Sequence, residues 1–280
     1  MTKLRLTLAC GDYDFLRPLI NGEIQPQGIE LNVLTMPSPE RHGRMLKHEE
    51  FDVCELSLVG YLVSRDKGCG YNAIPVFPHR RFRHQYMVKR TGCGIDKPAD
   101  LNGKRVALDT LQNSAGLWMR GILEHEYGIP HKEIEWFSDL DEDIEFERPK
   151  GLRLTRVPDT TSVEKELVEG RIDALLHTDL IEPIVEKDPR VARLFPDYQA
   201  EEISFYKKTQ MFPIMHVVGI RRALVEQYPW LPINLYKAFN ESKAAGMKRM
   251  FNPRVVPLAW YTEAWEAERA LLGPDPWEYG

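Results

Sequence analysis

Short apolar segments with a period of two alternate with longer segments of helical spacing along most of this chain. Leu4, Leu6 and Leu8 alternate with polar residues, and a second strand-like segment follows at residues 28–34. Residues 113–127 instead place apolar side chains along one face of a helix. This alternation of strands and helices predicts an α/β fold with mainly parallel strand pairing.

The same patterns extend over the rest of the chain. A helix at residues 37–47 is expected to begin with Ser38 as its N-cap and Pro39 in its first turn. A charged segment at residues 138–151 has no period and is predicted to be solvated surface. Further strands are expected at residues 51–58, 71–77, 86–89, 104–109, 134–137, 170–177 and 212–220. Further helices are expected at residues 61–68, 162–169, 221–228 and 233–248.

Charge and cysteine content restrict the class of protein. A net charge of -5 gives no general attraction to nucleic acid or anionic lipid. No run of about 18 apolar residues indicates a membrane span. Residues 6–10 are too few for the apolar core of a signal peptide, which needs about 7–15. The 4 cysteines show no CxxC pair or zinc-like spacing, so we expect reduced thiols in a cytoplasmic protein, with a catalytic thiol as the alternative.

The densest cluster of polar side chains is PHRRFRH at residues 78–84, directly after an apolar strand. Arg81 and Arg83 suit a carboxylate or phosphate, because a guanidinium donates two parallel hydrogen bonds. In an extended segment they would point one way, and Phe82 and His84 the other. Phe82 would stack on an aromatic ligand or pack in the core. The alternative is a solvated basic loop, but ligands of α/β proteins bind at the carboxyl ends of strands.

Other candidates lie at the ends of neighbouring strands. Asp12 and Asp14 follow the first strand and would orient a phenol, pair with an arginine or cap a helix. Glu55 ends a similar strand, where its carboxylate would face the ligand or pair with an arginine. His216 lies in an apolar strand and is either a hydrogen-bonded core residue or a site residue. The start of the helix at residue 113 offers N–H groups to an anion.

Metal and nucleotide motifs are missing from the sequence. HExxH, GxGxxG, GxxxxGK[ST] and GxSxG do not occur, although His79, His84 and His216 could converge in space.

Six ordered segments together resemble the 4,5-dihydroxyphthalate decarboxylase family: GDYD, FDVCELSLVGYL, IPVFPHRRFRH, LNGKRVALDTLQNSAGLWMRGILEHEYGI, FPIMHVVGIRR and DPWEYG. The resemblance implies a fold similar to type II periplasmic binding proteins, with a ligand cleft between two lobes. Residues 1–88 with 212–280 would form lobe one, and residues 89–211 lobe two. Crossovers near residues 82–89 and 208–213 would join them. The arginine-rich segment would then lie at the hinge.

This chain departs from the family pattern at three positions and at its end. Phe15 stands where an arginine is expected, and His79 and Gln85 stand where small residues are usual. The family continues with a helical tail beyond the segment that ends here at Gly280. These departures bear on the exact substrate.

The activity implied by the resemblance is loss of CO2 from a hydroxylated aromatic (di)carboxylate such as 4,5-dihydroxyphthalate, without a cofactor. A hydroxyl para to the carboxylate pushes electrons into the ring as it loses its proton, the ring carbon is protonated, and CO2 leaves as aromaticity returns. We expect His84 or His216 as the proton donor, and Asp14 or Glu55 to orient the phenol. The remaining candidates would contact the substrate, with the arginines on its carboxylates: Arg81, Arg83, Arg120, Phe82, Ser57, Gln112, Ser114 and His79.

Two other functions remain open at this point. The same fold would serve a non-catalytic binding protein for a small anionic aromatic ligand. A transport receptor of this kind needs a signal peptide, and a cytoplasmic sensor needs a basic DNA-binding segment. Neither is expected from this sequence. A second enzyme class on this fold, one making a cofactor precursor, has no supporting cysteine-rich motif. A small-molecule substrate is the expected partner, and a homo-oligomer is compatible with the sequence.

Overall fold

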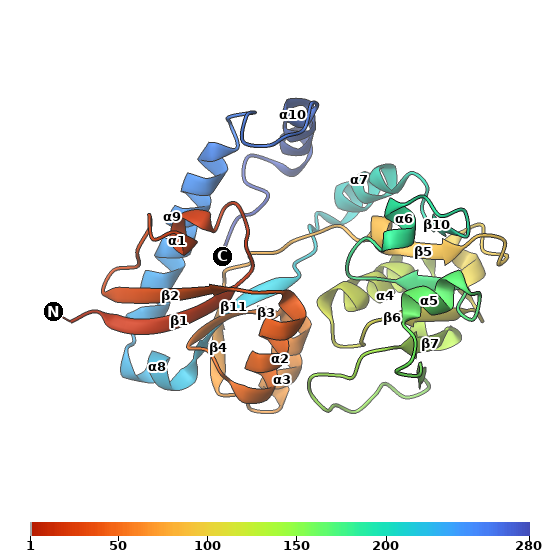
Figure 1. The fold of residues 1–280 in the computed structure, drawn as a ribbon, viewed down its shortest axis with the longest axis horizontal. Coiled ribbons are helices and arrows are strands. Elements are labelled where there is room, and N and C mark those ends of the chain that lie inside the picture. Colours follow the sequence, from red (N-terminus) through yellow and green to blue (C-terminus); the bar gives the residue numbers. More distant parts are fainter. Residues whose placement is uncertain (1) are drawn as a thin grey trace. The chain divides into compact units, whose positions relative to one another are not determined.

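The computed structural model describes residues 2–280, which form two compact units (Figure 1). Unit 1 consists of the chain up to Arg80 together with Ile214–Gly280, and unit 2 is Arg81–Pro213. The chain therefore passes between the units twice, next to Arg80 and next to Pro213. Sequence analysis places these boundaries at residues 88 and 212. The first one lies earlier in the structure, so the arginine-rich segment continues into unit 2.

Unit 1 is built on a five-stranded sheet with the order β2-β1-β3-β11-β4. Strand β1 pairs in parallel with β2 and β3, whereas β11, which follows the return from unit 2, is antiparallel to β3 and β4. The strands are β1 (Leu4–Cys10), β2 (Ile29–Thr35), β3 (Val53–Ser57), β4 (Tyr71–Ile74) and β11 (His216–Arg221). The helices are α1 (Arg17–Ile20), α2 (Ser38–His48), α3 (Leu58–Asp66), α8 (Arg222–Gln227), α9 (Leu231–Arg249) and α10 (Tyr261–Leu272).

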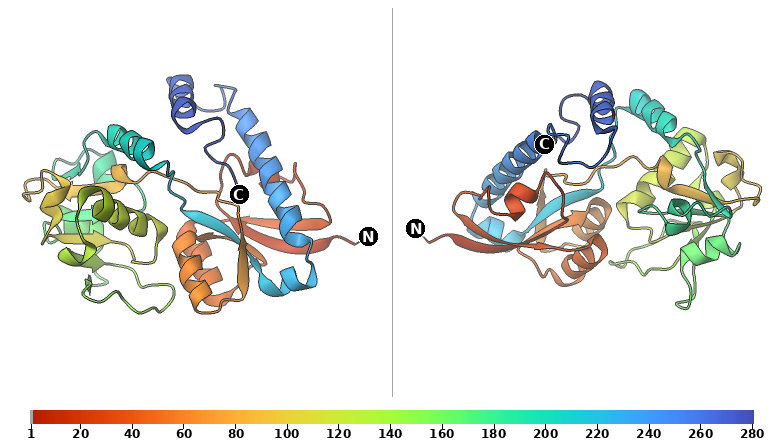
Figure 2. Two further views of the ribbon diagram at one scale, coloured as in Figure 1. Left: turned by 180° about the vertical axis from the view of Figure 1, so that it is seen from behind. Right: turned by 45° about the horizontal axis from the view of Figure 1, so that its top comes forward.

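The two faces of this sheet bury separate cores. Leu8 of β1 and Phe239 of α9 belong to one core, and Cys54 of β3 and Met45 of α2 belong to the other. Figure 2 shows the blue helix α9 and the orange helices α2 and α3 on opposite faces. Successive side chains of a strand point to opposite faces, so Glu55 projects toward the α9 side, next to Cys54 on the α2 side.

Unit 2 contains a six-stranded sheet with the order β10-β5-β9-β6-β7-β8. Pairing is parallel from β9 through β8 and antiparallel where β5 contacts β9 and β10. Its strands are β5 (Met87–Arg90), β6 (Arg105–Leu108), β7 (Glu135–Ser138), β8 (Arg153–Arg156), β9 (Ala174–Leu176) and β10 (Val191–Arg193). Its helices are α4 (Ser114–Tyr127), α5 (Val163–Val168), α6 (Glu182–Val185) and α7 (Tyr198–Thr209), with short 3-10 turns η1 (His84–Tyr86), η2 (Pro98–Leu101) and η3 (His131–Glu133).

The α/β class is confirmed, with three local corrections. Both sheets are mixed rather than mainly parallel, because β11 and β5 follow the two crossovers and enter their sheets antiparallel to a neighbour. Helix α2 begins at Ser38, with Pro37 as its N-cap. The strand expected at residues 212–220 begins only at His216. Within residues 2–280, no helix is both long and apolar enough to cross a membrane.

Candidate active site

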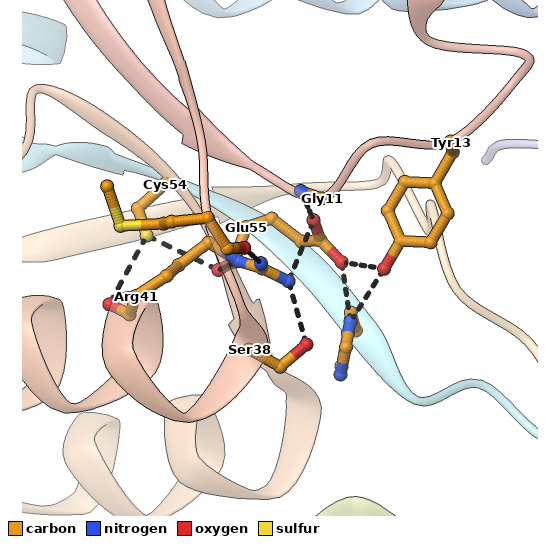
Figure 3. Close-up of polar contacts among 8 residues, drawn as sticks. Gly11, Tyr13, Ser38, Arg41, Cys54 and Glu55 are labelled. Atoms are coloured by element: carbon orange, nitrogen blue, oxygen red, sulfur yellow. Dashed lines mark hydrogen bonds and ion pairs between the residues drawn. The ribbon is translucent and has the colours of Figure 1, made fainter. Parts of the chain in front are cut away.

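The carboxylate of Glu55 is the centre of a buried polar cluster in unit 1 (Figure 3). Its Oε2 accepts hydrogen bonds from the Gly11 N–H (2.7 Å) and from the Arg41 guanidinium (3.0 Å). Its Oε1 accepts one from the Tyr13 hydroxyl (2.6 Å) and lies 2.5 Å from Nδ1 of His216. Four donors from three separate segments, the loop after β1, helix α2 and strand β11, therefore converge on one carboxylate.

Strand order explains why these segments meet. Parallel strands β1 and β3 end at the same edge of the sheet, and antiparallel β11 begins there. The register pairs Val218 with Glu55 and His216 with Ser57, so Glu55 and His216 are diagonal neighbours on one face. Sequence analysis places Glu55 near the end of its strand, and β3 ends two residues after it, at Ser57.

All three nitrogens of the Arg41 guanidinium donate to acceptors within unit 1, among them the Glu55 carboxylate. Its Nε donates to the Glu55 backbone carbonyl (3.1 Å), Nη1 donates to the Met36 carbonyl (2.5 Å), and Nη2 donates to Ser38 Oγ (3.1 Å) as well as to the carboxylate. Only 1 % of the Arg41 side chain is exposed. This guanidinium therefore neutralises an internal carboxylate and does not serve a ligand.

The surroundings of Glu55 fix its protonation state. Burial acts to raise the pKa of Glu55, but Arg41 and then His216 outweigh burial and hold this pKa well below its usual range. Burial and the Glu55 charge raise the pKa of Tyr13 well above its usual value. Glu55 is therefore ionised at neutral pH, while Tyr13 is a neutral phenol that donates. A carboxylate saturated by four donors is a weak proton acceptor and a strong orienting group.

Three imidazole rings are in contact at this position. The ring centroid of His216 lies 4.8 Å from that of His42 on α2 and 4.7 Å from that of His79, in the segment after β4. The backbone carbonyl of His79 accepts the N–H of Met215 (2.8 Å), which fixes that segment against the start of β11. In the described part of the chain, no three His, Cys, Asp or Glu side chains are placed to hold a metal ion together.

The geometry defines what His216 can do chemically. Its Nδ1 faces the Glu55 carboxylate, so the tautomer with a proton on Nδ1 donates to that carboxylate. Proton exchange with a substrate would then use Nε2. A histidine oriented by a buried carboxylate is the arrangement used in general acid–base catalysis.

The loop after β1 contributes a residue that sequence analysis missed. Asp14 and Asp12 are exposed and form ion pairs with Arg17, at 3.4 Å and 3.1 Å, so pairing with an arginine, one of the alternatives expected from the sequence, is what the structure shows for both. Tyr13, between them, reaches Glu55 instead. A Cβ on Gly11 would come within 2.7 Å of the Tyr13 ring, so only glycine leaves room for this conformation.

Ser57 and Phe15 have structural partners in unit 1. The Ser57 side chain caps α3 by accepting the N–H of Gly60 (3.4 Å). Phe15 stacks on Tyr13 with ring centroids 5.5 Å apart and lies 5.4 Å from Trp277. Phe15 thus extends the aromatic surface beside the Glu55 cluster.

The arginine-rich segment does not act as one group. Arg81 is exposed and its Nη1 donates to the Tyr86 hydroxyl (2.7 Å). Arg83 is only 2 % exposed, donates to the Thr178 carbonyl (2.8 Å) and has its pKa lowered to about 10 by burial. The Phe82 ring packs 4.8 Å from that of Phe212. Arg81 is therefore the one of the two predicted arginines whose side chain is accessible.

His84 has the surroundings of a core residue in unit 2. It is 1 % exposed and packs against the rings of Phe195 (5.1 Å), Phe205 (5.8 Å) and Tyr127 (6.2 Å). Burial lowers its pKa to about 4, so the ring is neutral at neutral pH. The expected extended alternation fails here, because His84 begins the 3-10 turn η1. His79 and His216 converge in unit 1, and His84 belongs to the other unit.

A buried carboxylate stabilises this turn and gives a testable pH effect. Glu202 of α7 accepts the N–H of Gln85 (3.2 Å), and burial raises the pKa of Glu202 to about 7. A carboxyl group whose pKa is raised on folding favours the fold below its unfolded pKa, and this contribution is lost as the pH rises to about 7. We expect Glu202→Gln to be more stable than wild type at pH 8, by on the order of 1–3 kcal/mol, with the difference shrinking toward pH 5.

Urea unfolding at pH 5 and pH 8 measures this difference. Glu186→Gln, an exposed position in the same unit, is the control. Equal pH dependence of Glu202→Gln and wild type would contradict the assignment.

An internal carboxylate binds the segment just before α4. Glu142 accepts the N–H groups of Leu111 (2.7 Å) and Gln112 (3.0 Å), so this residue of the otherwise largely exposed charged segment anchors the chain ahead of the helix. Arg120 is turned inward and donates to the carbonyls of Leu111 (2.8 Å) and Gly116 (3.3 Å). At the helix start itself, the N-cap Asn113 side chain accepts the N–H of Gly116.

Gln112 and Ser114 are likewise placed within unit 2. The Gln112 side chain accepts the Ile144 N–H (3.2 Å) and also donates to the Ile144 carbonyl. Ser114 is the buried first residue of α4, after the N-cap Asn113. The Gln112 side chain therefore connects the segment before α4 to Ile144.

Comparison with known proteins identifies the fold and the family. No protein-family model matches the chain. Solved structures with the type II periplasmic-binding-protein fold are similar in fold, including the periplasmic aliphatic sulphonate binding protein of Escherichia coli (TM-score 0.57, 14% identity, 99% of this chain and 81% of that one). A periplasmic sulfonate-binding protein of Methylobacillus flagellatus KT gives a TM-score of 0.55 at 14% identity, over 95% of this chain and 73% of that one.

Sequence relatives are more specific than these structures. The 4,5-dihydroxyphthalate decarboxylase of Comamonas testosteroni is 37% identical over 289 aligned residues, which cover 100% of this chain and 88% of the relative. The protein of the same name from Pseudomonas putida is 32% identical, over 74% of this chain and 83% of the relative. The chain belongs to the 4,5-dihydroxyphthalate decarboxylase family.

Proposed function

We propose that this protein is a carboxy-lyase that removes CO2 from a hydroxylated aromatic carboxylate such as 4,5-dihydroxyphthalate. Family membership supports this activity. The observation that carries the chemistry is the ionised, fully buried Glu55 that orients His216. Binding a ligand does not require such a dyad, whereas protonating a ring carbon requires a positioned acid.

The reaction needs one proton acceptor and one proton donor. A base takes the phenol proton, electrons move into the ring, and an acid protonates the carbon that bears the carboxylate. The C–C bond to the carboxylate then breaks, CO2 leaves, and the bonding pair restores the aromatic ring. His216, through Nε2, is the proposed acid, and the half-buried His79 beside it is the proposed base. The electrons are accommodated by the substrate's own ring, so this route uses no cofactor.

Arg81 is the proposed partner of a substrate carboxylate. Its guanidinium is exposed, and only Arg80 separates it from His79 along the chain. A hydrogen bond to a charged group contributes about 1.5–3 kcal/mol, so we expect Arg81→Ala to raise KM by about 10- to 100-fold with a smaller change in kcat.

Arg83 and Arg153 provide the comparison for that variant. Arg83→Met should lower the melting temperature, because it removes a buried donor to the Thr178 carbonyl. Arg153→Ala, at an exposed position of β8, should change neither KM nor stability. An unchanged KM in Arg81→Ala would remove Arg81 from substrate binding.

The direct test of function is CO2 release from a panel of hydroxylated aromatic mono- and dicarboxylates. We expect turnover with at least one dicarboxylate, and turnover slower by about 10²–10⁴-fold with His216→Asn prepared identically. The second candidate is a non-catalytic binding protein, which the solute-binding proteins of the same fold favour. Stoichiometric binding measured by calorimetry, without CO2 release from any compound, would establish that alternative.

The cytoplasm is the proposed location of this reaction. The four cysteines (Cys10, Cys54, Cys69 and Cys93) are free, as is usual in a reducing compartment. Recovery of the protein in the periplasmic fraction of a bacterial host would contradict this location.

A further inference from the structure

The Tyr279 side chain lies in a core of unit 1, and its hydroxyl group has no partner there. Tyr279 is 4 % exposed and belongs to the same core as Leu8 and Phe239. Its Oη is buried, and none of residues 2–280 forms a hydrogen bond with it. A buried hydroxyl without a partner is unfavourable, and a phenylalanine would fill the same space without that cost. Polar groups that break such packing rules concentrate at functional sites.

The segment that carries Tyr279 is held in place by other groups. Lys243 of α9 donates to the Asp275 carboxylate (2.5 Å) and to the Trp277 carbonyl (3.0 Å). The backbone carbonyl of Tyr279 accepts the Tyr236 hydroxyl (3.1 Å). The hydroxyl of Tyr279 is therefore not needed to fix this segment against α9.

A second buried donor without an acceptor belongs to Arg80, which contacts the same segment. Nη2 of Arg80 donates to the Glu278 carbonyl (2.7 Å), and the guanidinium lies 5.4 Å from the centroid of the Phe77 ring. In the part of the chain that the structure describes, Nε of Arg80 has no hydrogen-bond partner. Burial lowers the pKa of Arg80, and Tyr279 is the largest influence that opposes this shift. Arg80 and Tyr279 are therefore close enough to interact electrostatically.

The Tyr279 hydroxyl lies on the same side of the sheet as the proposed acid. Glu55 and His216 project from their strands toward the α9 side, where Tyr279 is buried. Burial raises the pKa of Tyr279 well above its usual value, and the Glu55 charge raises it further, so the hydroxyl is a neutral donor. The Phe15 ring lies 5.4 Å from that of Trp277 and joins this segment to the aromatic surface beside the Glu55 cluster.

We propose that the Tyr279 hydroxyl and the Arg80 guanidinium together bind a carboxylate group of the substrate. Both residues belong to unit 1, and the two oxygens of a carboxylate accept one hydrogen bond from each. The neighbouring carboxylates of Asp275 and Glu55 are each paired with a cation of their own. A ligand reaches the pair from the side of Arg80, which is partly exposed.

This inference rests on the proposed function and narrows its substrate class. Arg81 is the proposed partner of one substrate carboxylate, so a second carboxylate site is useful only for a dicarboxylate. The Arg80–Tyr279 pair therefore favours aromatic dicarboxylates over monocarboxylates.

Phthalate is the probe for this site, because it has two carboxylates but no hydroxyl and cannot follow the proposed reaction. We expect Tyr279→Phe to raise the Kd of phthalate by about 10- to 100-fold, the effect of losing one hydrogen bond to a charged group. Arg80→Lys keeps the charge but loses the fork of donors, and should raise this Kd by about tenfold. Tyr71→Phe, which removes a hydroxyl from the other core of unit 1, should bind phthalate as tightly as wild type. Calorimetric titration measures all four proteins.

A stability measurement separates ligand binding from a structural role of the hydroxyl. Tyr279→Phe should melt at or above the wild-type temperature without ligand, because it removes a buried group that has no partner among the described residues. The same concentration of phthalate should raise the melting temperature of wild type more than that of Tyr279→Phe, since a ligand stabilises according to its affinity. A ligand-free Tyr279→Phe protein that melts below wild type would contradict the proposal.

Three binding results would also overturn it. One is a wild-type protein that does not bind phthalate. Another is a phthalate Kd that is unchanged in either variant, as expected if Tyr279 holds only an internal water. The third is a loss of affinity for catechol, which has hydroxyls but no carboxylate, that equals the loss for phthalate in Tyr279→Phe. None of these measurements needs CO2 release, and CO2 release with an unchanged phthalate Kd would remove only this assignment and leave the proposed function intact.

Discussion

His216→Asn is expected to lower kcat by about 10²–10⁴-fold, the usual contribution of a general acid. Asparagine can still donate a hydrogen bond to Glu55, but it cannot exchange a proton near neutral pH. The substrate dissociation constant should change by less than about threefold, because only the transition state requires the transferred proton. Single-turnover CO2 release and calorimetric titration measure the two quantities separately.

Two other histidines make this prediction specific. His48→Asn, at the exposed end of α2, should leave turnover unchanged. His84→Asn should lower the stability of unit 2, because it disturbs a ring packed against Phe195 and Phe205, while turnover per folded molecule stays near wild type. If His84→Asn lowered turnover and His216→Asn did not, the proton donor would be the other histidine considered from the sequence.

Strand periodicity carried most of the predictable information. Alternation located β1, an apolar run interrupted by Glu55 located β3, and pairing with an arginine was one of the two alternatives expected for Glu55. The family resemblance supplied the fold, because the order of its motifs, rather than their composition, is characteristic. Strand periodicity depends on neighbouring residues, and the family resemblance depends on the order of motifs along the chain. Both can therefore be recognised without knowing which distant segments are in contact.

The residues that sequence analysis missed depend on contacts between distant segments. Arg41 and His42 belong to a helix whose apolar pattern does not reveal which polar side chains will be buried. Burial of Arg41 is stabilised by Glu55, and nothing near Arg41 in the sequence indicates that partner. Tyr13 was not chosen as a candidate because its neighbours Asp12 and Asp14 are acidic, and acidic residues are the usual candidates for proton chemistry.

The arginine-rich segment shows the opposite error, in which a local cluster suggests one shared role. Arg83 is held by Thr178, the residue after it packs on Phe195, and the turn is stabilised by Glu202. These partners lie about a hundred positions further along the chain, and each defines a separate environment. A dense cluster of charges in a sequence therefore does not assign one shared role to its members.

The same fold serves binding proteins and decarboxylases, so the difference must lie in specific side chains. A binding protein needs complementary polar groups that are fixed in both the free and the bound state. A decarboxylase also needs a group whose protonation changes during the cycle. In unit 1 the buried Arg41–Glu55 pair supplies a fixed charge, and His216 beside it is the group that we propose exchanges a proton.

Glu55→Gln is expected to lower kcat by about 10²–10⁴-fold, because loss of an orienting carboxylate leaves the imidazole in the wrong tautomer. The carboxylate accepts from Gly11, Arg41, Tyr13 and His216. An amide would present its NH2 group to at least one of these donors. His216 would then lose its charged partner, while the substrate dissociation constant should change far less.

The same substitution should destabilise the fold in a pH-dependent way. Breaking a buried ion pair by neutralising one member costs about 3–5 kcal/mol, because the Arg41 charge stays buried without its partner. The pKa of Glu55 is lowered on folding, so its contribution is present above the unfolded value of 4.5 and is lost as the pH falls toward the lowered pKa. The stability difference between wild type and Glu55→Gln should therefore be largest near neutral pH and should shrink below pH 4.5.

Glu30→Gln, which removes an exposed ion pair with Arg5 on the same sheet, should cost less than about 1 kcal/mol. A Glu55→Gln protein as stable as Glu30→Gln across this pH range, with wild-type turnover, would show that the carboxylate neither holds Arg41 nor orients His216.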